Sequence, residues 1–264
     1  MWGRWRRSGS RQWSGAAGYR AYAVGDVHGR LDLLDRLLRQ IAEDHRARGD
    51  DARPLLVLLG DLIDRGPDSR GVIERLVGGA LPGFQTLALC GNHEEALLRL
   101  LDEEEPGLLD QWLHFGGDAC VRSYGEDPLR LSSLAEADAL ARLRQIIPKT
   151  HQDFLRSLAD TFMFGEYLFV HAGIRPGIPL DRQQPRDLRW IREPFLSDPR
   201  DHGMMVVHGH TITAEPDVRA NRIAVDTGSY REGVLTALMV DGSERAWLQQ
   251  RSSDPAANGG DEWA

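Results

Sequence analysis

The stretch that most constrains the fold is PLLVLLGDLIDRG, residues 54–66. Its apolar run over 54–59 is continuous, as expected for a strand buried on both faces. The Gly- and Asp-rich segment over 60–66 predicts a loop, and apolar residues at helical spacing follow over 72–77. A strand, a loop and a helix in this order form one unit of an α/β fold, and such loops commonly carry function.

The same order occurs on both sides of this stretch. Strand-like runs at 19–24 and 86–90 each lead into a polar, Gly-containing turn and then a helical pattern. Further strands are expected at 167–171, 204–208, 222–225 and 234–240. Helices are expected at 103–115, 140–147 and 151–158. We therefore predict an α/β protein with a β-rich core, flanking helices and a helical insert over roughly 102–165.

Composition predicts one folded domain with two loose ends. The chain has 264 residues, a formal net charge of −8 and 41% hydrophobic residues, which is ordinary for a globular protein. A basic arm over 1–18 and a polar tail over 251–264 lack periodicity, so both are expected to be disordered around a domain at 19–250. The acidic balance argues against nucleic acid as a partner, because phosphate backbones are bound mostly by positive surface.

Cysteine and hydropathy patterns bear on the compartment. Cys90 and Cys120 form no CxxC pair, so no disulfide framework is expected, and a reducing compartment is the simpler interpretation. No run approaches the ~18 apolar residues of a membrane span. The basic N-terminus lacks the apolar stretch of a secretory signal. We expect a cytoplasmic protein with no membrane partner.

Five short blocks carry the residues of chemical interest: GDVHG at 25–29, GDLIDRG at 60–66, GNHE at 91–94, HAG at 171–173 and HGHT at 208–211. They supply six candidate metal ligands with carboxylate, amide or imidazole donors: Asp26, His28, Asp61, Asn92, His171 and His210. Mixed oxygen and nitrogen donors suit Mn²⁺, Fe or Zn²⁺, whereas Ca²⁺ prefers oxygen alone. We predict two divalent metal ions, with Mn²⁺ favoured.

The spacing of the blocks supports a metal site. Asp26 and His28 are two residues apart, so extended backbone points both side chains to one face. Asp61 heads the second block and is the candidate for a carboxylate that bridges two metals. One such block is weak evidence, because an aspartate after a strand more often caps a turn. Five blocks in this order, each after a strand-like run, favour a metal site over chance.

Residues beside the ligands predict the rest of a hydrolytic mechanism. His93 directly follows Asn92, so it is poorly placed to share that metal and is the candidate general acid. Asp64 would orient His93 by a hydrogen bond that fixes its tautomer. Arg65 suits a two-point grip on phosphoryl oxygens, and a surface ion pair is its alternative.

These blocks resemble the phosphoprotein phosphatase family of serine/threonine phosphatases, within the calcineurin-like metallophosphoesterases, and are most similar to the bacterial and phage branch typified by lambda phage phosphatase. The resemblance covers roughly residues 20–245, and GDxxDRG followed by GNHE is its specific core. It implies a central β-sandwich flanked by helices.

The resemblance also implies roles for the candidate residues. One metal would be bound by Asp26, His28 and Asp61, and the other by Asp61, Asn92, His171 and His210. The same comparison makes His93 the proton donor, Asp64 its partner and Arg65 a phosphate-binding arginine.

Three features are less determined by the resemblance. A second phosphate-binding arginine is expected in DLRWIREPF, residues 187–195, with Arg192 preferred and Arg189 in reserve. FGGD at 115–118, with Trp112, resembles a segment that lines the substrate cleft, and packing is its alternative. His208 stands where eukaryotic members are expected to have arginine; a role behind the metal ligands, a pH-sensing role and a plain strand position remain open.

The predicted activity is metal-dependent hydrolysis of phosphoesters by direct attack of a water-derived hydroxide. A phosphorylated protein or peptide is the expected substrate, which makes the chain a serine/threonine protein phosphatase, with phosphotyrosine or phosphohistidine as further targets. A small phosphoanhydride is the alternative, as in a symmetrical diadenosine tetraphosphatase. A nucleolytic phosphodiesterase is disfavoured by the acidic charge and by the DRG ending at 64–66.

Overall fold

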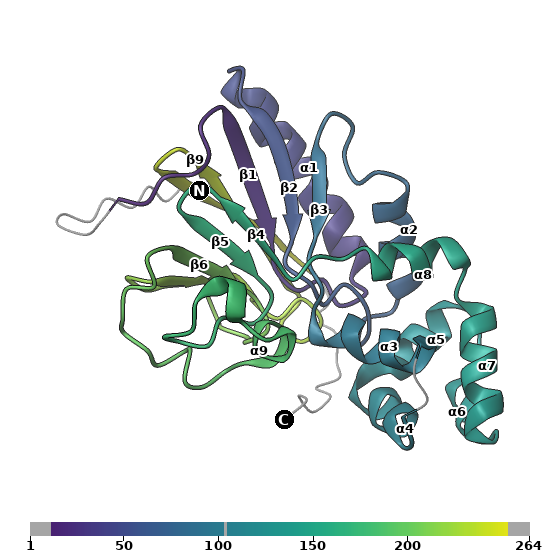
Figure 1. The fold of residues 1–264 in the computed structure, drawn as a ribbon. Coiled ribbons are helices and arrows are strands. Elements are labelled where there is room, and N and C mark those ends of the chain that lie inside the picture. Colours follow the sequence, from purple (N-terminus) through teal and green to yellow (C-terminus); the bar gives the residue numbers. More distant parts are fainter. Residues whose placement is uncertain (1–11, 103–104, 253–264) are drawn as a thin grey trace.

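The computed structural model describes residues 12–102 and 105–252, and within them the β-strands form two five-stranded sheets (Figure 1). The first sheet has the order β10-β9-β1-β2-β3: Glu244–Arg251, Val234–Asp241, Tyr19–Val24, Arg53–Leu58 and Gln85–Ala88. The second has the order β4-β5-β6-β8-β7: Thr161–Phe164, Tyr167–Val170, Met205–His208, Arg222–Ala224 and Asp217–Val218. β1, β2 and β3 are parallel, as are β5, β6 and β8.

Alternating side chains hold the two sheets face to face. In β1, Ala21 and Ala23 join an apolar cluster with Phe169 and Val207 of the second sheet. Tyr22 of β1 points the other way, into the cluster formed with the helices. Each inner face therefore contributes every second residue, as in a β-sandwich. The predicted β-sandwich with flanking helices is confirmed.

Helices cover the outer face of the first sheet. α1 (Leu31–Arg48) and α2 (Ser69–Val77) bury their apolar sides in this layer, and α3 (Asn92–Asp102) follows β3 after a short turn. On the second sheet, the outer face packs against the segment that contains a 3₁₀ turn (Leu180–Arg182) and α9 (Pro185–Trp190).

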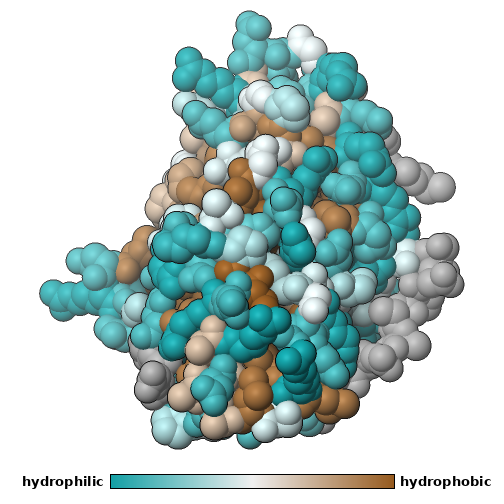
Figure 2. Space-filling model, turned by 90° about the vertical axis from the view of Figure 1, so that its right-hand side faces the viewer, coloured by the Kyte–Doolittle hydropathy of each residue, from teal (hydrophilic) through white to brown (hydrophobic). Residues whose placement is uncertain are grey.

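The helical insert extends the main core. It comprises α4 (Leu108–Trp112), a kinked turn (Leu113–Gly117), α5 (Asp118–Ser123), α6 (Pro128–Ser132), α7 (Glu136–Ile146) and α8 (Lys149–Arg156). Its buried apolar residues are continuous with those of α1, α2 and α3. Figure 2, which looks onto the side where the insert lies, shows a largely hydrophilic face with scattered apolar residues. The insert therefore shares the hydrophobic core of the domain and does not form a separate unit.

Some boundaries differ from the prediction. The helix expected at 103–115 begins at Leu108, because Gly107 has a φ of 78° and is left-handed. β4 and β10 were not predicted. Both are edge strands, and only Leu248 of β10 is fully buried, so the apolar pattern that identifies a central strand is absent there.

The described part of the N-terminal segment packs against the domain. Trp13 is 3% exposed among the residues between the sheets, and the N–H of Gly15 donates to the carbonyl of Gly242. The expectation of a loose arm therefore needs correction from residue 12 onward, because Trp13 contributes to the core. Residues 1–11 of that arm and 253–264 of the expected tail lie outside the described residues. No described helix is long and apolar enough to cross a membrane.

Candidate dinuclear metal site

The five sequence blocks meet at one edge of the sandwich. β1, β2 and β3 are parallel, so the loops that follow them leave from the same side, and Figure 1 shows these strand ends converging near α3. The loops after β5 and β6 of the second sheet reach the same place. The six predicted metal ligands are all buried: Asp26, His28, Asp61, Asn92, His171 and His210.

The backbone of these loops is strained where the site residues lie. Within the described chain, five residues other than glycine have positive φ: His28, Asp61, Asp64, Arg65 and His210, with φ between 45° and 71°. All five belong to the predicted site. Residues other than glycine rarely adopt this left-handed backbone conformation, and those that do cluster at functional sites.

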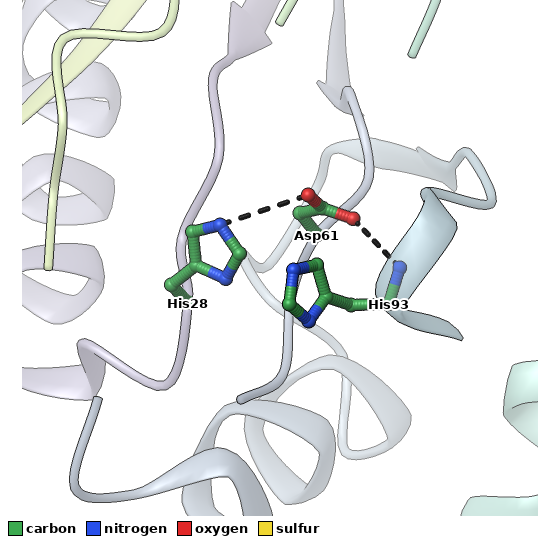
Figure 3. A group of neighbouring side chains, drawn as sticks. All are labelled: His28, Asp61 and His93. Atoms are coloured by element: carbon green, nitrogen blue, oxygen red, sulfur yellow. Dashed lines mark hydrogen bonds and ion pairs between the residues drawn. The ribbon is translucent and has the colours of Figure 1, made fainter. Parts of the chain in front are cut away.

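Asp61 occupies the centre of the cluster. Its Oδ2 lies 3.6 Å from His28 Nε2, and its Oδ1 lies 3.4 Å from His171 Nε2. Oδ1 also accepts the backbone N–H of His93 at 3.1 Å, and Figure 3 shows both carboxylate oxygens engaged from opposite sides. A carboxylate between two sets of nitrogen donors has the geometry required of a bridging ligand.

Two groups of donor atoms share this carboxylate. His28, Asp61 and His93 form one group, and Asp61, His171 and His210 form the other, with the ligand atoms of each within 4.8 Å of one another. The first group contains His93 where the prediction has Asp26. Asn92 joins the second group through its Oδ1, which lies 3.1 Å from His171 Nε2.

Asp26 approaches from β1 on the same side as His210. Its Oδ2 accepts the backbone N–H of His210 at 3.0 Å. Its Oδ1 and the Nε2 of His210 are buried and have no hydrogen-bond partner among the described residues. Leaving such atoms unpaired costs about 1–3 kcal/mol each, which divalent ions bound here would offset. The donor set therefore fits a dinuclear metal site.

Glycines allow this close approach. A Cβ at Gly91 would lie 2.1 Å from Asp61 Oδ1, and a Cβ at Gly209 would lie 2.0 Å from Asp26 Oδ1. Neither position has room for a side chain.

Burial and neighbouring charges shift the pKa values of the candidate ligands. Burial lowers the pKa of both His28 and His210 well below the usual range, which keeps each imidazole neutral, as a metal ligand must be. Burial acts to raise the pKa of Asp61, but the charges of His171 and His93 outweigh it and hold that pKa well below its usual range. The Asp61 carboxylate is thus ionised and able to bind cations. Burial acts to lower the pKa of His171, but the Asp61 and Asp26 carboxylates raise it to about 10, so a metal ion bound by His171 would displace its proton.

His93 and Asp64 form a fully buried pair. His93 Nδ1 lies 2.7 Å from Asp64 Oδ2, and both side chains are 0% exposed. The side chain of Asp64 therefore orients the imidazole ring, which lies edge-on to His28 with 4.8 Å between ring centroids. The sequence predicted this contact.

The cavity beside the ligands distinguishes the two candidate arginines. Arg65 and Arg192 line it together with Asp26, His28, Asp61, Asn92, His93, His210, Ile212 and Asp226. Arg189 points elsewhere, since its guanidinium binds the carboxylate of Asp160 at 2.7 Å. Arg65 lies over the ring of Tyr230, with 4.5 Å from the guanidinium carbon to the ring centroid.

Glu94 is a residue whose part in the site the sequence did not suggest. Its carboxylate accepts the backbone N–H groups of Asp61, Leu62, Ile63 and Gly91 at 2.7–3.2 Å. Burial raises its pKa to about 7. The available signal was its place in GNHE, directly after two site residues.

Asp226, His208 and the two cysteines belong to neither group of candidate ligands among the described residues. Asp226 lines the cavity, and its Oδ1 accepts the N–H of Gly228. His208 is 0% exposed, and burial lowers its pKa to about 3, which favours a neutral imidazole and a structural role over pH sensing. Cys90 and Cys120 are free and buried, and burial raises the pKa of both thiols, as expected for inert cysteines.

The fold and this site define a metallophosphoesterase, a hydrolase of phosphoesters. The chain belongs to the calcineurin-like phosphoesterase family, whose model matches residues 19–231. The family assignment made from the sequence blocks is therefore confirmed.

Known relatives differ in their named activities. The chain is 31% identical to serine/threonine-protein phosphatase 1 of Salmonella typhimurium, over 81% of this chain and 89% of that protein. It is 33% identical to a symmetrical bis(5'-nucleosyl)-tetraphosphatase of Dechloromonas aromatica, over 59% of this chain and 44% of that protein. A solved structure described as a candidate diadenosine tetraphosphatase is similar in fold, with a TM-score of 0.62, 23% identity and coverage of 94% and 100%.

Proposed function

We propose that this chain is a protein phosphatase that hydrolyses phosphoserine and phosphothreonine, with tolerance for other phosphorylated side chains. The buried His93–Asp64 pair at the cavity is the observation that carries this proposal. A serine or threonine alkoxide is a poor leaving group and needs a proton donor. A nucleotide released from a phosphoanhydride leaves without one, so an anhydride hydrolase has less need of a dedicated acid.

Each predicted ligand has a place in the proposed mechanism. Asp61 would bridge two metal ions; Asp26 and His28 would complete one site, and Asn92, His171 and His210 the other. Two divalent ions held there, with Mn²⁺ favoured, would lower the pKa of a bound water and withdraw charge from the phosphoryl group.

The remaining residues act on the phosphoryl group and the leaving oxygen. Arg65 and Arg192 would bind phosphoryl oxygens and stabilise the charge that develops on them. His93 would donate its Nε2 proton to the leaving oxygen, while Asp64 holds Nδ1.

The described residues that line the cavity include no serine, threonine or cysteine. Its Asp26 and Asp61 would hold the metals, and Asp226 Oδ1 is engaged by the N–H of Gly228, so the proposal favours direct attack by water over a phosphoenzyme.

Removal of the metal ions tests whether turnover depends on them. Chelation is expected to abolish turnover of a phosphoserine peptide, and Mn²⁺ to restore it, because Asp61 and its neighbours supply ligands but no alternative electrophile. The same metal-loaded protein is assayed on a phosphopeptide panel and on dinucleoside polyphosphates. Turnover that survives chelation would refute the metal mechanism.

That panel also separates the second candidate function. The tetraphosphatase named among the relatives and the structural neighbour described above favour a phosphoanhydride substrate. A kcat/KM at least tenfold higher for a dinucleoside tetraphosphate than for every phosphopeptide would select that function and reject the protein phosphatase.

The two arginines provide a further test. Arg192→Ala is expected to lower kcat/KM by about 10–100-fold, the value of one or two charge-assisted hydrogen bonds to the phosphoryl group. Arg189→Ala removes a guanidinium from the same segment, but this guanidinium binds Asp160. The kcat/KM of this variant should therefore stay within about threefold of the wild-type value. Steady-state kinetics on one phosphopeptide compare both variants, and a larger loss for Arg189→Ala would reverse the assignment.

A further inference from the structure

Trp112 of the insert reaches the acid pair. Its side chain is 0% exposed, and its indole Nε1–H donates to Asp64 Oδ2 at 2.8 Å. The same oxygen lies 2.7 Å from His93 Nδ1. One carboxylate oxygen therefore accepts from an imidazole and an indole at once, and the indole comes from a segment 48 residues further along the chain.

The indole N–H constrains the carboxylate of Asp64, a residue whose backbone is already held in place. The backbone of Asp64 is held because its N–H donates to Ser69 Oγ at 2.9 Å. Rotation of the carboxylate about its last bond is broad and roughly two-fold in aspartates. Two donors that converge on Oδ2 define the rotation, and so define the direction in which His93 is held.

The turn after Trp112 packs tightly on the neighbouring residue. The carbonyl of Gly116 accepts the N–H of Arg65 at 2.9 Å, and a Cβ at Gly116 would lie 2.5 Å from Arg65 Cγ. A Cβ at Gly117 would lie 2.3 Å from the Trp112 ring. Both glycines let the insert backbone close on Asp64 and Arg65, so the indole has little freedom to move.

We propose that Trp112 is a positioning residue for proton donation: its indole N–H fixes Asp64 so that His93 presents Nε2 to the leaving oxygen. The insert then contributes to the catalytic apparatus through this contact. This inference rests on the proposed function, because it concerns the acid that an alkyl phosphoester requires.

Removing the N–H tests this role. Trp112→Phe is expected to lower kcat on a phosphoserine peptide by about tenfold or more, the value of a hydrogen bond to a charged group. The loss on p-nitrophenyl phosphate should be several-fold smaller, because its leaving group departs without a proton. Trp247→Phe, in β10, is the matched control and should leave the ratio of the two rates unchanged.

Non-additivity distinguishes positioning from packing. In a His93→Ala background, Trp112→Phe should cause no further loss on the phosphoserine peptide, because the group it positions is gone. Equal losses on both esters, or a full additional loss in that background, would overturn the proposal. Should Trp112→Phe melt too low to assay, benzothienylalanine at position 112 keeps the ring and removes only the N–H.

A measurement without turnover separates this inference from the proposed function. In metal-free protein labelled with ¹⁵N, Asp64→Asn should shift the Trp112 indole signal, and loss of the indole N–H should shift the ring nitrogens of His93. Unmoved His93 signals would overturn the positioning role. Shifted signals together with a wild type active only on dinucleoside polyphosphates would reject the protein phosphatase and retain the contact.

Discussion

Replacing Asp61 by asparagine is expected to lower kcat/KM on a phosphopeptide by at least about 10³-fold and to reduce the bound metal from two ions to at most one per chain. Asp61 faces His28 with one oxygen and His171 with the other. An amide keeps the shape of the side chain but lacks the charge and one of the two oxygen donors. Activity and metal content, measured by elemental analysis, should therefore fall together.

A buried carboxylate outside the site provides the control. Asp44 is 7% exposed and accepts a hydrogen bond from Tyr22 at 2.7 Å, remote from the candidate ligands. Asp44→Asn should cost stability and leave two metals per chain. If Asp61→Asn retained two metals and wild-type turnover, the bridging role would be refuted.

Replacing His93 by alanine is expected to divide substrates by leaving group. Loss of a general acid lowers rates by about 10²–10⁴-fold, and an alkyl phosphoester should show that full effect. p-Nitrophenyl phosphate should lose much less, since its phenolate leaves without protonation. The measurement is kcat on both esters at saturating metal.

Metal content decides between two roles for His93. Its ring lies close enough to His28 and Asp61 to be a ligand, while its Nδ1 is held by Asp64. If His93 is a general acid, its removal leaves two metal ions per chain. If His93 is a metal ligand, its removal lowers the metal content. His151→Ala, which removes a buried histidine bonded to Tyr124, is the matched control and should leave the ratio of ester rates unchanged.

Much of the fold follows from local sequence pattern. Continuous apolar runs identified β1 to its ends and located β2, β5, β6 and β9 within a residue or two. The pattern failed at the edges of the sheets, where a strand such as β10 has one solvated side and few buried residues. Edge strands are defined by their neighbours, which a local pattern does not contain.

The site divides in the same way. The order of the five sequence blocks predicted that the six candidate ligands lie together, because glycines and strand ends mark where the loops turn. No role was predicted for Glu94, and Trp112 was predicted only as part of a segment that lines the substrate cleft. Their contacts with backbone amides of another loop and with Asp64 are tertiary, and a local pattern does not contain them. The sequence preferred Arg192 over Arg189, and the contact of Arg189 with Asp160, 29 residues away in sequence, supports that preference.

Thermal stability and activity make opposite demands at five positions with a left-handed backbone: His28, Asp61, Asp64, Arg65 and His210. Each such residue costs on the order of 1 kcal/mol, which glycine would recover. Selection for heat resistance alone should therefore enrich glycine at these positions, and every such gain would delete a group that the proposed mechanism uses. Thermostable variants of this enzyme are better sought in the sandwich and in the parts of the insert away from Trp112 and the turn that follows it, where a gain in stability removes no group that the proposed mechanism uses.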